Sequence, residues 1–149
     1  MQGMRLWHQK LIRYLPRQQL LGQHRECCAL RGKGWGRKHS TVDYVFKYTP
    51  SHLFEYHMKV MGEMGRRGYA IRNPKWFGRG YRGLRLKPHE LFLEMGTYVC
   101  PSGEIIYPEH DDRYLLECCL NLKAKGVELV NGKSLEEFLL ELETKGVHS

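Results

Sequence analysis

The chain has 149 residues, of which 42% are hydrophobic, and its formal net charge is +8. This length suits one domain with one core, and no run approaches the roughly 18 apolar residues that a membrane helix needs. Because residues 1–17 also lack the apolar core of a signal peptide, we expect a cytoplasmic, monomeric protein that folds as a single domain over residues 1–149.

The charge is divided unevenly along the chain. Residues 1–103 contain 19 Lys and Arg and 6 Asp and Glu, whereas residues 104–149 contain 5 and 10. Such asymmetry predicts a basic face that meets a polyanion, for which nucleic acid is the usual candidate. An anionic membrane surface would instead favour a basic amphipathic helix with large apolar residues opposite the charges, but the basic residues here lie among glycines and aromatics.

A first helix is predicted over residues 16–31, since Pro16 is tolerated in the first turn and Gly32 ends the helix. One broad side holds Leu20, Leu21, His24, Cys27, Cys28 and Arg31, and the other holds Gln19, Gly22, Gln23 and Glu26. Gly22 costs roughly 1 kcal/mol against Ala within a helix. Either a closely approaching partner or an ordinary packing contact explains a glycine one turn before Glu26.

Glu26 is the only acidic residue among the first 38, which contain nine Lys and Arg. A carboxylate weakens a phosphate-binding surface unless it has another role. Charge alone leaves two interpretations open, because Glu26 is either a functional carboxylate or the ion-pair partner of a neighbouring arginine. The basic, glycine-rich loop at residues 32–39 follows the helix, and it is not a P-loop because it lacks the Gly-Lys-Ser/Thr ending.

Three further helices and a short hairpin are predicted along the rest of the chain. A helix at residues 50–67 has Thr49 as N-cap and Gly68 as its stop, and Leu53, Tyr56, Val60, Met61 and Met64 form its apolar stripe. Residues 72–86 interleave arginines with aromatics, which suits phosphate and base contacts. Residues 98–100 and 105–107 are predicted to form a β-hairpin. Helices at 111–125 and 134–145 complete a mainly α, compact fold of about four helices, the last with a Ser134–Glu137 capping box.

The five cysteines include two adjacent pairs, and adjacent cysteines rarely bond each other. We therefore expect reduced, mostly buried thiols, and the cysteine and histidine spacings that support a metal site are absent.

One rival function is a metal-dependent nuclease that uses a polar cluster with His8 or His39. The cluster consists of Glu109, His110, Asp111 and Asp112. Acidic residues of this kind more often begin a helix, where they favour its dipole.

Several motifs occur in a shared order. They are Leu20-Leu21-Gly22-Gln23-His24-Arg25-Glu26, then Arg37-Lys38-His39, Arg66-Arg67-Gly68-Tyr69, Arg82-Gly83, and Tyr107 ahead of the third helix. From about residue 4 to residue 125 the chain resembles the pyrimidine-dimer DNA glycosylases of the phage endonuclease V type. The resemblance implies a DNA glycosylase with AP lyase activity, which nicks damaged double-stranded DNA at a pyrimidine dimer or a related base lesion. It also implies a kinked duplex with a flipped base, and neither metal nor cofactor.

The resemblance further implies that the α-amine of the mature first residue attacks C1′ and forms a Schiff base, while Glu26 assists. An α-amine, with a pKa near 7.7–8.0, is far less protonated at neutral pH than a lysine near 10.4. Counted back from Glu26, the first residue falls at Met4 or Arg5. Since three extra residues could displace the amine by about 10 Å, we expect a start at Met4; a folded-back extension or attack by Lys10 are the alternatives.

The same resemblance assigns the DNA-binding residues, which are Gln19, Gln23, Arg25, Arg31, Lys33, Arg37, Lys38, His39 and Arg82. Gln19 stands where the family has a histidine, Ala29 stands where it has an arginine, and the helix at 134–145 is additional. The alternative to an enzyme is a non-catalytic nucleic-acid-binding protein on the same scaffold, in which Glu26 is a structural ion-pair partner.

Overall fold

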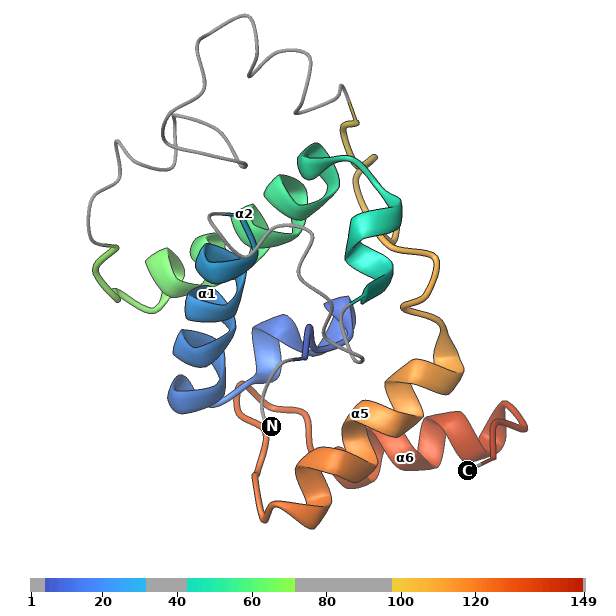
Figure 1. Cartoon of the computed structure of the whole chain (residues 1–149). Coiled ribbons are helices and arrows are strands. Elements are labelled where there is room, and N and C mark those ends of the chain that lie inside the picture. The colour runs from blue at the N-terminus through green and yellow to red at the C-terminus, as the bar shows by residue number, and fades with distance from the viewer. Residues whose placement is uncertain (1–4, 32–42, 72–97, 149) are drawn as a thin grey trace, which may run out of the picture.

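The computed structural model describes residues 5–31, 43–71 and 98–148. The predicted site residues Met4, Lys33, Arg37, Lys38, His39 and Arg82 therefore lie outside the described residues, as do the basic loop and the irregular stretch at 72–86. Helices dominate the described part, as expected (Figure 1). They are η1 (Gln9–Tyr14), α1 (Arg17–Arg31), η2 (Asp43–Lys47), α2 (Pro50–Arg66), α5 (Asp112–Ala124) and α6 (Leu135–Thr144).

The four α-helices within the described residues begin and end within one residue of the predicted bounds, because local capping fixes their ends. Asp111 Oδ1 accepts the Tyr114 amide at 2.8 Å before α5, and Ser134 Oγ accepts the Glu137 amide at 3.2 Å before α6. Gly68 follows α2 with a φ of +81°, a conformation that glycine adopts without strain. Thr49 is the N-cap of α2 but makes no side-chain capping bond.

The predicted β-hairpin at 98–100 and 105–107 is wrong, since the described residues there contain no strand. The backbone amides of the two segments bond to side chains of other elements instead of to each other. Tyr98 N donates to Ser51 Oγ at 3.0 Å, and Cys100 N donates to Glu55 Oε1 at 2.8 Å. Ile106 N donates to Gln9 Oε1 at 2.9 Å. These bonds tie the segment to α2 and η1.

The core forms where two helix pairs meet around the N-terminal segment. In Figure 1, η1 lies between the α1–α2 pair and the α5–α6 pair. Leu6, Leu11 and Leu15 are fully buried there. The predicted stripes of the four helices contribute the surrounding core residues, which include Leu20, Cys27, Leu53, Tyr56, Val60, Met64, Leu115, Cys118, Leu122, Leu135, Phe138 and Leu142. Burial of residues 6 and 7 therefore anchors the start of the described chain against both pairs.

A buried ion-pair network fixes the C-terminal end of α2. Glu63 is 2% exposed, it accepts from Arg67 Nε at 2.7 Å and it pairs with Arg66. Arg67 in turn donates to the carbonyls of Leu15 at 2.7 Å and Arg13 at 2.9 Å. The arginines that close α2 are thus partly used to hold this helix against η1.

None of the five cysteines, all of which lie in the described residues, forms a disulfide, and Cys27, Cys118 and Cys119 are buried. This agrees with the expectation of reduced, mostly buried thiols. Within residues 5–31, 43–71 and 98–148, no helix combines the length and apolar character that crossing a membrane requires.

Candidate active site

Glu26 is a buried carboxylate on α1, with only 8% of the residue exposed. Among the described residues, its Oε1 has no hydrogen-bond partner, and burial raises the pKa of its carboxyl above the ordinary value. Glu26 forms no ion pair with another described residue. The described residues therefore give no support to the interpretation that Glu26 is the ion-pair partner of a neighbouring arginine. A carboxyl with a raised pKa is suited to accept and return a proton near neutral pH.

The neighbouring polar residue on the same side of α1 holds the N-terminal segment in place. Gln23 is 2% exposed, and its Nε2 donates to the carbonyl of Arg5 at 2.9 Å. Its Oε1 accepts from Trp7 N at 2.6 Å and from the Tyr56 hydroxyl at 2.7 Å. The Tyr56 hydroxyl also lies 2.6 Å from the Trp7 carbonyl, so its single proton is shared between the two oxygens. The Gln23 side chain therefore joins residues 5–7 to both α1 and α2.

This arrangement places the start of the described chain against the helix that holds Glu26. Gln23 and Glu26 are three residues apart, which is about 4.5 Å along a helix axis and nearly the same side of it. The carbonyl of Arg5 is hence bonded to a side chain that leaves α1 one turn before Glu26. The N-terminal segment and the buried carboxylate therefore lie against the same helix in the fold.

The Arg5 side chain itself is occupied by α5. Its Nη1 lies 3.2 Å from Glu117 Oε2, and its guanidinium lies over the rings of Trp7 and Tyr114 at 5.7 and 5.9 Å from the ring centroids. The backbone of Arg5, and not its side chain, is thus the part that Gln23 holds near Glu26.

The predicted DNA contacts on α1 have different environments. Arg25 is exposed and Gln19 is half-buried, while Arg31 is the last residue of the helix. Gln23 is buried with its amide bonded to Arg5, Trp7 and Tyr56. In this structure its amide positions residues 5–7, and its contact with DNA stays a prediction. The sequence did not reveal that Gln23 and Tyr56 position the N-terminal segment.

The glycine one turn before Glu26 has room around it among the described residues. A Cβ added at Gly22 would meet only the Arg25 guanidinium there, at an ordinary contact distance of 3.6 Å.

Among the described residues, the acidic and histidine cluster of the rival nuclease does not form a group of metal ligands. His110 Nδ1 accepts the Gln9 amide at 3.1 Å and its Nε2 lies 2.6 Å from the Tyr44 hydroxyl. Burial, together with the nearby His8, lowers the pKa of His110 to about 3, so the ring is a neutral part of the core. Asp111 caps α5, and Glu109 accepts from the Tyr48 hydroxyl at 2.8 Å. His39 lies outside the described residues.

Comparison with known proteins gives a family for the first half of the chain. Residues 4–77 match the model of the family described as pyrimidine dimer DNA glycosylase. This match begins at Met4, includes α1, η2 and α2, and is shorter than the expected likeness to residue 125. No curated protein and no solved structure matches the chain. Through residues 4–77, the chain is thus similar to the pyrimidine dimer DNA glycosylase family, and this match supports DNA glycosylase activity.

Proposed function

We propose that this protein removes a pyrimidine dimer or a related base lesion from double-stranded DNA and then nicks the strand at the resulting abasic site. The observation that carries the proposal is a buried Glu26, whose Oε1 lacks a hydrogen-bond partner in the described part of the chain. It lies on the same helix as Gln23, which bonds the N-terminal segment from one turn earlier. The family match supports the glycosylase step.

In the proposed first stage, the α-amine of Met4 is the nucleophile. Its nitrogen forms a bond to C1′ of the damaged nucleotide while the bond from C1′ to the base breaks, and the base departs with the bonding electrons and takes up a proton. The attached nitrogen then loses one proton, and the bond from C1′ to O4′ breaks while O4′ takes up a proton, which gives a protonated Schiff base. An unprotonated α-amine is common enough at neutral pH to attack without a special pocket.

In the proposed second stage, Glu26 moves protons. As a carboxylate it stabilises positive charge at C1′, and it then removes a proton from C2′ of the Schiff base. The C3′–O bond breaks with this proton loss, and the 3′ phosphate leaves. The raised pKa of Glu26 suits it to this exchange.

The proposed DNA face includes the exposed Arg25 and the half-buried Gln19 on α1. It continues through Arg31, the last residue of α1, and through residues that follow α1 or lie between α2 and α5 in the sequence, namely Lys33, Arg37, Lys38, His39 and Arg82. Cationic side chains there would neutralise phosphates, so affinity for DNA would fall steeply with salt.

A nicking assay tests the proposal against its two rivals. We expect the protein to cut a duplex with one site-specific pyrimidine dimer at that lesion, and to leave the undamaged duplex intact. Cutting should persist in EDTA at a temperature where circular dichroism shows a folded chain. Binding without cutting would establish the non-catalytic alternative, and cutting that Mg²⁺ restores after chelation would favour a metal-dependent nuclease.

A further inference from the structure

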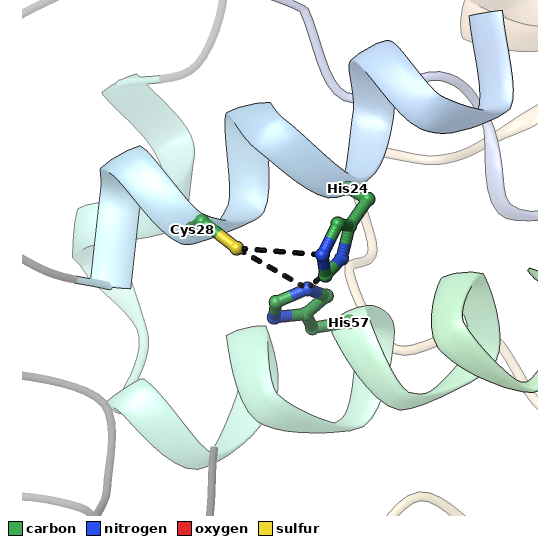
Figure 2. Close-up of side chains that lie close together, drawn as sticks. All are labelled: His24, Cys28 and His57. Carbon is green, nitrogen blue, oxygen red and sulfur yellow. Dashed lines mark hydrogen bonds between the residues drawn. The ribbon is translucent and has the colours of Figure 1, made fainter. Parts of the chain in front are cut away.

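Three side chains that the proposed reaction does not use converge between α1 and α2. Figure 2 shows His24 and Cys28 on α1 facing His57 on α2. His24 Nδ1 lies 2.8 Å from His57 Nε2. Cys28 Sγ lies 3.8 Å from His24 Nε2 and 4.0 Å from His57 Nε2. One donor atom from each residue lies within 4.8 Å of the other two, and within residues 5–31, 43–71 and 98–148 no other such group of three occurs.

The donor atoms match the preferences of zinc. Thiolate and imidazole are its usual ligands, at about 2.3 Å and 2.0–2.1 Å. At tetrahedral angles these bond lengths place two nitrogens about 3.3 Å apart and a sulfur about 3.6 Å from each nitrogen. The 2.8 Å separation involves His24 Nδ1 and the 3.8 Å separation involves His24 Nε2, and only one of these nitrogens would bind the ion. With one donor atom per residue, the three atoms lie within 4.8 Å of one another, so rotations of the side chains that shift the atoms by about 1 Å give the tetrahedral separations.

The helices predispose the three residues to this arrangement. His24 and Cys28 are four residues apart, so their side chains leave the same side of α1 one turn apart. His57 is fully buried on the facing side of α2, whereas His24 and Cys28 are half-buried. A bound ion would thus be held by a rigid buried imidazole from α2 and by two half-buried side chains from α1.

The cluster is separate from the candidate active site. Around a helix of 3.6 residues per turn, positions 24 and 28 each lie about 160° from position 26. An ion there would therefore join α1 to α2 without contacting the Glu26 face. It would also hold α1 near its C-terminal end at Arg31, where the basic segment of the sequence begins.

We propose that His24, Cys28 and His57 bind one Zn²⁺ ion as a structural link between α1 and α2. Binding replaces the hydrogen bond between the two imidazoles and releases the thiol proton of Cys28, because zinc takes the thiolate and the neutral imidazoles. This site is independent of the proposed glycosylase reaction, and its test does not use nicking.

Cobalt substitution in the full chain tests the proposal, because a thiolate bound to Co²⁺ gives a near-ultraviolet charge-transfer band. We expect the chelator-washed protein to develop this band, to saturate at one equivalent of Co²⁺, and to lose the band when Zn²⁺ is added. At a free Zn²⁺ concentration about 100 times the Kd, Tm should rise by about 5–10 °C.

Matched variants assign the ligands. Cys28→Ser should abolish the band and weaken Zn²⁺ binding more than about tenfold, whereas Cys100→Ser, at a half-buried cysteine outside the cluster, should leave both unchanged. Cys28→Asp, which keeps an oxygen ligand, should bind Zn²⁺ without the band, and it serves if the serine variant does not fold. No Co²⁺ uptake by the parent protein, or a band that survives in either Cys28 variant, would overturn the proposal.

Discussion

Replacing Glu26 by Gln is expected to slow nicking of dimer-containing DNA by about 100- to 10,000-fold, the usual contribution of a general acid or base. The amide has the shape of the carboxyl but cannot take the C2′ proton or stabilise positive charge at C1′. Affinity for the damaged duplex should stay close to that of the parent protein, because Glu26 is buried and contributes no phosphate contact. Single-turnover nicking and fluorescence anisotropy measure the two quantities.

Thermal unfolding at two pH values separates the catalytic from the structural interpretation of Glu26. Burial raises the pKa of its carboxyl in the folded state, so folding favours the protonated form. The free energy of unfolding therefore loses a contribution as pH rises from the unfolded pKa, near 4.3, through the folded pKa. The Tm of Glu26→Gln should match or exceed that of the parent at pH 7, and the difference should shrink at pH 4. Nicking at the parental rate, or a lower Tm at pH 7, would make Glu26 a structural residue.

Replacing Gln23 by Ala is expected to lower the free energy of unfolding by about 2–4 kcal/mol. The change leaves the buried Trp7 amide and the Arg5 carbonyl without the partners that Gln23 supplies, and each unsatisfied buried group costs about 1–3 kcal/mol. It should also slow nicking by up to about 100-fold at temperatures where the variant is folded. A displacement of about 1 Å is enough for such a loss, and the Gln23 bond fixes Arg5 beside α1.

Gln18→Ala is the matched control for this experiment, because Gln18 is an exposed glutamine on the same helix. Urea unfolding should show a change within about 0.5 kcal/mol for the control, and its nicking rate should equal that of the parent. A Gln23→Ala protein that nicks at full rate while folded would show that the position of residues 5–7 does not limit the reaction.

The helices could be predicted from sequence because their signals are local. Pro50, Gly68, Ser134 and Gly126 mark ends within one turn of the residues they limit, and the apolar stripes repeat every three or four residues. The segment at 98–107 gave a local hairpin signal, but its amides found partners on Ser51, Glu55 and Gln9, which are distant in the sequence. No pattern within the segment identifies such partners.

The candidate site was predictable in part for the same reason. Glu26 stands out as a single acid in a basic region, but periodicity placed Gln23 with it on a polar side of the helix. That side is covered by residues 5–7 and Tyr56, which only the tertiary fold brings there. The four-residue spacing of His24 and Cys28 is visible in the sequence, whereas the third ligand comes from α2.

Trapping of the covalent intermediate with borohydride tests the central claim most directly. A chain that begins at Met4 should form a reduced adduct with dimer-containing or abasic duplex DNA, and peptide mapping should place the adduct on the first residue. A chain that begins at Met1 should form less adduct. The trapping rate should rise with pH and level off near about 8, the range of an α-amine. Equal trapping in both chains, mapped to Lys10 and still rising toward about pH 10 as expected for a lysine, would contradict attack by the N-terminal amine.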